Sequence, residues 1–415
     1  MRIFVLQHGL VDRHSHAFAE AFGWRRALAR RGLAFELLIH RNAIPLVVEQ
    51  TGGVPVFPFD PMAEVRRDPI TDELQGILFF GESFANACSV LNEKVSAADV
   101  VIIPHSTARE LFGIARWVRT IPENRRPKFA FVLINPDLRW KLSADGTKMN
   151  GNISFFRFGA NQLAEVLPEG RVIYCADNSI LRTTLATVLN QPCSECALTI
   201  DYFTVDEVPG DPDEPDWKPV HIGVLGDFRH EKGRFVVADV IRKFCGARPG
   251  RDIFVQIQNP EQARILDRSL DIHGGRSLHI FAGQLSHGGY VRRLQSLEIL
   301  LMPYSRDRYA MLSSGIFAEA LAHGIVAVVP AGTWMARQLA AGWGAGVSFD
   351  RFSVDAVTDA LIRASDDYAA LKEKAGLRQE EWRRHQSIPA LLNHILSRLG
   401  VSVSGDDGGV VDSKH

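Results

Sequence analysis

The sequence predicts an α/β protein made of two doubly wound, Rossmann-like domains. Short apolar runs alternate with amphipathic helical patterns in both halves of the chain, and this alternation is typical of βαβ units in a parallel sheet. Residues 206–219 separate the halves, hold six acidic residues and four prolines, and cannot form the interior of a helix or strand. The length of 415 residues suits two cores of roughly 200 residues each.

These features predict a simple division of the chain. We expect an N-terminal domain at 1–205, a linker at 206–219 and a C-terminal domain with closing helices at 220–400. The last residues, 401–415, are rich in Gly, Ser and Asp, a composition that favours a disordered tail.

The first domain opens with a strand, a helix and a second strand. RIFVLQ at 2–7 and FELLIH at 35–40 are short apolar runs, and apolar residues recur at helical spacing between them up to Gly32. The loop after the first strand reads HGLVDR. Because it lacks the G-x-G-x-x-G fingerprint, the sequence disfavours a Rossmann oxidoreductase.

The alternation then continues to residue 189. Further strands are expected at 54–59, 99–104, 128–134 and 172–176. Helices are expected at 83–96, 106–118 and 179–189. Residues 135–160 are rich in Gly and Asn and show no clear period, so we expect an irregular segment there, facing a site.

The second domain repeats the pattern. Strands are expected at 221–226, 252–258, 278–282, 298–303 and 325–330. Helices are expected at 233–244, 260–269, 289–295, 316–323, 354–363 and 368–399, the last one broken near Pro389.

The unit at 298–330 has the clearest chemical use. The loop Ser313, Ser314 and Gly315 joins a strand to a helix, and the N-terminus of such a helix can hold a phosphate on its free N–H groups. Glu319, one turn into this helix, can accept hydrogen bonds from ribose hydroxyls. A solvated glutamate favoured by the helix dipole explains the residue equally well.

A second anion-friendly loop follows the first strand of this domain. Gly226 ends the strand, and the loop DFRHEKG holds Arg229 and Lys232. Parallel strands place their carboxyl ends on one side of the sheet, so both loops should face one crevice. We therefore expect Arg229 and Lys232 to contact a diphosphate there, rather than to be ordinary solvated charges.

These two stretches resemble the GT-B fold glycosyltransferases, especially the large family 4 group of retaining enzymes that use nucleotide sugars. GDFRHEKG at 226–233 and SSGIFAEALAHGIVAVVP at 313–330 are similar to the signatures of that group. The resemblance covers the whole chain as architecture but specific motifs only in 221–335. It implies two Rossmann-like domains facing a central cleft.

The resemblance assigns roles in the second domain. Lys232 matches the lysine that binds the donor diphosphate, and Glu319 matches the glutamate that binds the ribose. Ser314, Gly315 and Ile316 match the loop whose amides lie beneath the phosphates.

The resemblance also assigns first-domain residues. His105 resembles a histidine near the reacting sugar, while Gly9 and His16 fall where the acceptor is expected. Asp137 follows a strand end, where catalytic groups collect, although Asn-Pro-Asp is also a common turn. His105 and His16 can equally be structural residues.

The chain departs from the group's pattern at two positions. Asp227 stands where an arginine is usual, and Met311 stands where the group has a glutamate that orients the donor sugar. In some subgroups a basic residue just before the small-residue loop takes over this role, and here that neighbourhood offers only Arg306 and Arg308.

The expected function is therefore transfer of a sugar from a nucleoside-diphosphate sugar to a glycan or lipid-linked acceptor, with retention. The resemblance implies no cofactor and no bound metal, and a setting in polysaccharide assembly. Two alternatives stay open: an inactive GT-B binding or scaffold protein, which Met311 and Asp227 suggest, and a sugar-nucleotide epimerase.

Composition narrows the partners and the location. The net charge is −1, from 47 basic and 48 acidic residues, so we expect no nucleic-acid partner. The N-terminus shows no signal peptide, and no run reaches the ~20 apolar residues of a membrane span. We expect a cytoplasmic protein. Its basic face at residues 25–31 could be solvated or could contact anionic lipid at the inner membrane face.

The cysteines give no functional signal in the sequence. All five are scattered, which fits a reducing compartment. Cys193 and Cys196 form one C-x-x-C, but no second pair or nearby histidine completes a zinc site. The sequence therefore predicts incidental thiols.

Overall fold

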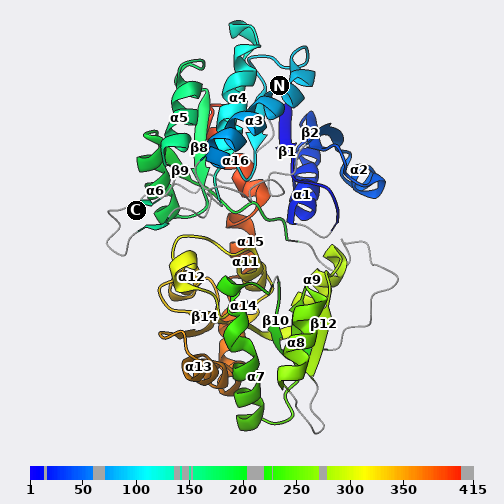
Figure 1. Cartoon of the computed structure of the whole chain (residues 1–415), viewed down its shortest axis with the longest axis vertical. Helices are drawn as coiled ribbons and strands as arrows, with labels where there is room; N and C mark the ends of the chain where they lie inside the picture. The colour runs from blue at the N-terminus through cyan, green and yellow to red at the C-terminus, as the bar shows by residue number, and fades with distance from the viewer. Residues whose placement is uncertain are drawn as a thin grey trace. The chain divides into compact units, whose positions relative to one another are not determined.

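The computed structural model of the chain describes residues 1–13, 16–58, 71–134, 141–142, 149–150, 153–202, 219–226, 228–270 and 278–402. By its contacts the chain forms two compact units. The first consists of Met1–Asp12, Glu20–Thr199 and Ile388–His415, and the second of Arg13–Ala19 and Ile200–Ser387. Each unit holds one large parallel sheet with helices packed on it (Figure 1).

The first unit is built on a seven-stranded sheet in the order β3-β2-β1-β4-β5-β8-β9. Its strands are β1 (Ile3–Gln7), β2 (Phe35–His40), β3 (Val54–Phe57), β4 (Val100–Ile103), β5 (Lys128–Val132), β8 (Val172–Ala176) and β9 (Cys193–Glu195). All neighbouring strands pair in parallel. The order reverses between β1 and β4, which is the switch point of a doubly wound sheet.

Helices cover this sheet. They are α1 (His16–Arg30), α2 (Pro45–Thr51), α3 (Thr71–Cys88), α4 (Ala108–Arg119), α5 (Ile153–Ala164), α6 (Ser179–Leu189) and α16 (Ile388–Arg398). Two 3-10 turns lie at Ser89–Leu91 and Glu123–Arg125, and the short strands β6 (Lys141–Leu142) and β7 (Met149–Asn150) pair antiparallel.

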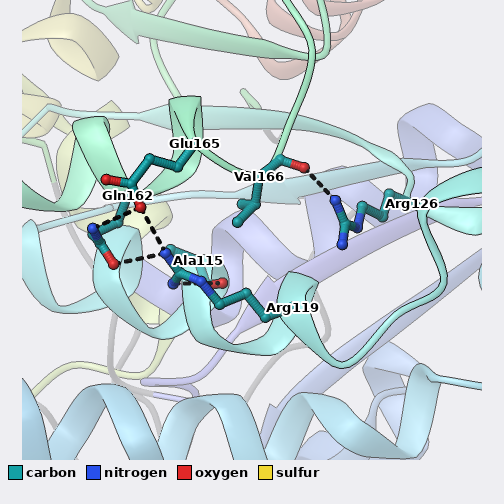
Figure 2. A network of polar contacts seen from close by, with 6 residues as sticks. All are labelled: Ala115, Arg119, Arg126, Gln162, Glu165 and Val166. Carbon is teal, nitrogen blue, oxygen red and sulfur yellow. Dashed lines mark hydrogen bonds and ion pairs between the residues drawn. The ribbon is translucent and has the colours of Figure 1, made fainter.

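Arginines join the end of α4 and the loop after it to the end of α5 and the turn that follows. Arg119 Nη2 donates to Gln162 Oε1 at 2.7 Å and to Glu165 Oε2 at 3.1 Å (Figure 2). Arg126 Nη1 donates to the Val166 carbonyl at 2.6 Å. Because exposed pairs of this kind contribute little to stability, the buried apolar faces of the helices hold this layer in place.

The second unit has a six-stranded parallel sheet in the order β12-β11-β10-β13-β14-β15. Its strands are β10 (Val220–Val224), β11 (Ile253–Ile257), β12 (Leu278–Ala282), β13 (Leu297–Leu301), β14 (Val326–Pro330) and β15 (Gly346–Phe349). In chain order the strands run 3-2-1-4-5-6, which is the Rossmann order, with its switch point between β10 and β13.

A 3-10 turn and nine helices complete the described part of this unit. They are η4 (His230–Lys232), α7 (Arg234–Ala247), α8 (Pro260–Leu270), α9 (His287–Gln295), α10 (Arg306–Tyr309), α11 (Gly315–Ala322), α12 (Trp334–Ala340), α13 (Val354–Asp366), α14 (Tyr368–Gly376) and α15 (Gln379–His385). The prediction of two Rossmann-like α/β domains is confirmed.

Two helical predictions and one prediction of an irregular segment were wrong in their bounds. The helix expected at 83–96 is α3, which begins at Thr71 and ends at Cys88, because Ile77, Phe80 and Phe84 form a buried face at helical spacing. The segment 135–160 is not irregular throughout, since α5 begins at Ile153. The pattern at 368–399 is divided into three helices rather than two.

The C-terminal helix is not part of the second unit, where we expected residues up to 400. Ile388–Arg398 packs with the first unit, with Leu391 and Ile395 fully buried. The Lys128 ammonium also donates to the Leu399 carbonyl at 2.6 Å. The expected linker, 206–219, lies outside the described residues except for Pro219.

Candidate functional site

The switch point of the second sheet is where two loops meet. β10 and β13 are neighbours, with Ile222 paired to Ile299. Their carboxyl ends lead into the loops 225–233 and 302–314. Ligands of open α/β sheets bind in the crevice at this position, so the site is built here.

Glycines let the two loops approach each other. Gly226 and Gly233 have φ angles of +95° and +83°, which are left-handed conformations that favour glycine. A Cβ atom on Gly233 would lie 2.2 Å from the Pro303 carbonyl oxygen. Ser305 N also donates to the Glu231 carbonyl at 2.7 Å. The loops therefore form one close-packed corner.

Lys232 places its ammonium in this corner. A Cβ atom on Gly226 would lie 3.1 Å from Lys232 Nζ and 2.6 Å from Ile316 Cδ1. The ammonium also lies 5.4 Å from the centre of the Tyr304 ring, a favourable cation–π distance. Gly226, Lys232 and Ile316, which the sequence pointed to separately, are brought together.

The N-terminus of α11 forms the adjoining wall. Ser314 caps the helix, and its Oγ accepts a hydrogen bond from Phe317 N at 3.4 Å. Gly315 and Ile316 begin the helix, so their amides have no acceptor within it. Ser313 precedes the cap. These amides and the positive end of the helix dipole can bind an anion beside the Lys232 ammonium.

Glu319 lies one turn further along α11. It is half-buried, which does not fit the alternative of a solvated glutamate, and it accepts a hydrogen bond from the hydroxyl of Tyr290 on α9. Burial raises the pKa of Glu319 to about 7, although the Tyr290 hydrogen bond lowers it. A carboxyl group held at such a cost to its ionised form marks a candidate binding residue.

Arg229 takes a different position from Lys232. Its Nη1 atom lies 3.6 Å from Glu231 Oε1, and its side chain is half-exposed. It lines a cavity of about 620 Å³ with the neighbouring His230 and with Gln258 and Asn259 after β11. Arg229 is therefore placed to contact a ligand that extends along this side of the loop.

The two arginines near Met311 already have contacts. Arg308 Nη1 donates to Glu231 Oε1 at 2.7 Å. Arg306 packs against Gly332, where a Cβ atom would lie 2.6 Å from its Nε. Met311 itself is half-buried. Asp227, the other departure, lies outside the described residues.

His105 occupies a strained position in the first unit. It follows β4 and has a φ of +55°, which is uncommon for a residue other than glycine and often found at functional sites. Its Nε2 atom is hydrogen-bonded to Glu20 on α1. Burial lowers its pKa, but the charge and hydrogen bond of Glu20, helped by Asp177 and Glu110, raise the pKa above its ordinary value overall.

A second histidine–carboxylate pair lies nearby in this unit. His8 Nε2 lies 3.2 Å from Glu110 Oε1, and both side chains are buried. His8 also makes edge contacts with the rings of Phe57 and Phe84. Gly9 was predicted from the sequence but its neighbour His8 was not, because the carboxylate partner of His8 lies 102 positions away in the chain.

We expect Glu20→Gln to lower the pKa of His105, because it removes the main cause that raises it. Imidazole NMR titration measures this pKa. The folded pKa is above the unfolded one, so the pair stabilises the fold below about pH 6.5 and this contribution is lost as pH rises through the folded pKa. The variant should therefore lose more stability at pH 6 than at pH 9.

The control is Glu36→Gln, at the exposed pair with Lys94, which should leave the pKa of His105 unchanged. If Glu20→Gln also left this pKa unchanged, the assignment would be contradicted.

The three acceptor-side predictions fare differently. Gly9 lies in the turn after β1 and is exposed, with open space around it. His16 begins α1 but belongs by its contacts to the second unit, where a Cβ atom on Gly315 would lie 3.7 Å from its Cε1. Asp137 lies outside the described residues.

Tyr290 and Glu231 were also not predicted as site residues from the sequence. Tyr290 falls within an expected helix, and Glu231 within the expected loop, but neither had a recognisable partner in the sequence.

Within the described parts of the chain no three His, Cys, Asp or Glu side chains are grouped to hold a metal ion. In the same parts no helix has the length and apolar character needed to cross a bilayer.

Comparison with known proteins shows the fold. No family model and no curated protein matches the chain. Sucrose-phosphate synthase from Thermosynechococcus elongatus is similar in structure, with a TM-score of 0.61, 13% identity, and 96% of this chain and 98% of that chain covered. A glycosyltransferase from Rickettsia africae ESF-5 gives 0.60 and 12%, with 96% and 97% covered.

A third similar structure is UDP-GlcNAc 2-epimerase from Neisseria meningitidis bound to UDP-GlcNAc. It has a TM-score of 0.51 and 13% identity, with 96% of this chain and 99% of that chain covered. All three alignments span both units. The chain thus has the GT-B fold, with two Rossmann-like domains, as the resemblance implied.

Proposed function

We propose that this GT-B protein is a glycosyltransferase that moves a sugar from a nucleoside-diphosphate sugar to a glycan or lipid-linked acceptor. One observation supports this most: Lys232 Nζ lies over Gly226 beside the first turn of α11, at the switch point of the second sheet. A cation and a helix N-terminus converging on one corner suit a diphosphate.

The chemistry follows from that placement. When the bond between the sugar and the diphosphate breaks, negative charge develops on the departing phosphate. The Lys232 ammonium and the amides of Gly315 and Ile316 stabilise that charge without reorganising. Glu319 accepts hydrogen bonds from the ribose hydroxyls, and Arg229 adds a charge on the cavity side. The mechanism needs no cofactor or metal, and we propose retention from the family 4 resemblance.

In this proposal His105 binds the sugar and takes no part in proton transfer. Burial lowers its pKa but Glu20 raises it above the ordinary value overall, which stabilises the imidazolium, a form that donates hydrogen bonds. We place Gly9 and Asp137 with the acceptor and, because of its position beside Gly315, His16 with the donor. The protein would work in the cytoplasm on cell-envelope or exopolysaccharide precursors, with any membrane contact peripheral at the inner face.

Two observations keep a second function in view. The Neisseria epimerase shares this fold while holding UDP-GlcNAc, so an epimerase site fits the same scaffold. Met311 lies where a sugar-orienting glutamate is expected, which also suits a protein that binds nucleotide without transfer.

A thermal-shift screen against UDP, GDP, ADP, CMP and dTDP tests the donor site. A ligand at 100-fold its Kd stabilises a protein by about 2.7 kcal/mol, and we expect one nucleotide to do this. Glu319→Ala should abolish the shift. Glu373→Ala, at an exposed position on α14, is the matched control and should keep it.

The outcomes separate the alternatives. If no nucleotide shifts the melting temperature, the donor site is contradicted. If a nucleotide binds but the sugar of its sugar derivative is neither transferred nor released by hydrolysis, the chain is a nucleotide-binding protein without transferase activity. If the sugar nucleotide is returned with inverted configuration at one carbon, product analysis by NMR identifies an epimerase.

A further inference from the structure

The first unit gathers three reactive side chains around a cysteine that the sequence left unassigned. Cys175 on β8 pairs in register with Ser194 on β9. Side chains alternate between the faces of a sheet, so Ser194 and Cys196, two residues further on, lie on the face of Cys175, and Cys193 lies on the other. His394 reaches the cluster from α16.

The contacts within this cluster are direct. Cys175 Sγ lies 3.5 Å from Ser194 Oγ, and Ser194 Oγ lies 2.9 Å from His394 Nε2. Because Cys175 pairs with Ser194, Cys196 is its diagonal neighbour on the same face of the sheet. Backbone pairing fixes the arrangement, because Cys196 N donates to the Ala176 carbonyl at 2.8 Å.

The cluster makes its least exposed thiol the most acidic. Hydrogen bonds from Cys196, His394 and Ser194 outweigh burial and lower the pKa of Cys175 to about 5. Burial raises the pKa of half-buried Cys193 to about 12. The thiolate is the nucleophilic form of cysteine. Cys175 is therefore the most reactive of the three thiols, whereas Cys193 is the most exposed.

A cavity of about 500 Å³ borders the cluster at Ser194. It is lined by residues 167–170 and 172–174, by residues 191–194, which include Cys193, and by Arg398 of α16. Ser194 belongs both to this wall and to the cluster. Hydrogen peroxide is scarcely larger than water, so it suits a buried thiol better as an oxidant than a bulky disulfide compound does.

We propose that Cys175 and Cys196 form a peroxide-sensitive thiol pair that closes reversibly to a disulfide. The Cys175 thiolate attacks one oxygen of hydrogen peroxide, the O–O bond breaks, and hydroxide leaves, giving a sulfenic acid. Cys196 then attacks that sulfur, its thiol proton joins the departing hydroxyl, and water leaves. One thiolate and one thiol together lose two electrons, and one peroxide is reduced to hydroxide and water.

Closing this disulfide changes the attachment of α16. Ser194 Oγ links Cys175 to His394 of α16, and a disulfide sulfur is a much weaker hydrogen-bond acceptor than the thiolate. The helix Ile388–Arg398 is the last described helix of the chain and packs on the first unit. Oxidation should therefore loosen this helix.

Peroxide treatment of the full chain tests the proposal. The reduced protein is oxidised, its remaining thiols are alkylated under denaturing conditions, and the peptides are mapped by mass spectrometry. We expect a Cys175 peptide joined to a Cys196 peptide, two hydrogens lighter, and restored by dithiothreitol. Hydrogen exchange in 388–398 should rise on oxidation.

The controls distinguish geometry from exposure. Cys193→Ser, the matched variant on the opposite face, should keep the link, while Cys196→Ser should lose it. A link between Cys193 and Cys196, oxidation confined to Cys193, or five unmodified thiols would overturn the proposal. These outcomes are read from the unsubstituted protein, so they do not depend on whether a variant folds.

Discussion

Replacing Lys232 by alanine is expected to lower kcat for sugar transfer by about 10²- to 10³-fold, which is the usual effect of removing one preorganised charge donor from a transition state. The reason is its position. Its ammonium lies 3.1 Å from the Cβ position of Gly226 and beside Ile316, at the start of α11. Initial rates with the nucleotide sugar found in the thermal-shift screen measure the loss.

The matched control is Lys243→Ala. Lys243 is an exposed lysine of the same unit, paired with Asp355, and its loss should leave kcat unchanged. The effect of Lys232→Ala should appear in kcat more than in KM, because the charge that it stabilises grows as the leaving group departs. An equal rise in KM with kcat unchanged would mean that Lys232 only binds the ground state.

The fold was largely predictable from local pattern. Strands β10 and β13 are buried apolar runs with clear ends, and Gly226 and Gly233 stand where left-handed turns are needed. Such signals act over a few residues, so a single sequence shows them. The helix α5 was missed because its buried residues, Phe156 and Ala160, follow a Gly- and Asn-rich segment that hides its start.

The partners within the sites were not predictable in the same way. Tyr290 and Glu319 are 29 positions apart, and His105 and Glu20 are 85 apart. Nothing in the local sequence around either residue specifies the other. The topology brings them together, so the role of Glu319 could be proposed from the sequence but its raised pKa could not.

The thiol cluster shows the same limit. The C-x-x-C motif drew attention to Cys193 and Cys196, which alternate between the faces of the sheet. The structure instead pairs Cys196 with Cys175, and His394 arrives from 198 positions further along the chain than Cys196. A motif read along one strand could not include a residue from α16.

Replacing Glu319 by glutamine is expected to stabilise the free protein at pH 8 while it weakens nucleotide binding. The folded pKa is about 7, against 4.5 for the free side chain, so between these values the folded state binds more protons and stability falls as pH rises. Above pH 7 the ionised carboxylate then costs up to about 3 kcal/mol. Glutamine keeps the shape and the acceptor for Tyr290 without the charge.

The pH dependence distinguishes a binding residue from a structural one. Thermal unfolding of Glu319→Gln should match the unsubstituted protein at pH 4, where both side chains are neutral, and exceed it at pH 8. Nucleotide affinity should rise with pH through about 7 in the unsubstituted protein and stay flat in the variant, because the ionised carboxylate is the stronger acceptor for ribose hydroxyls. Glu373→Gln should change neither. If Glu319→Gln were less stable at pH 8 and bound nucleotide normally, the carboxylate would serve the fold. If instead Glu319→Gln were more stable at pH 8 and bound nucleotide more weakly, the carboxylate would serve ligand binding and would destabilise the free protein.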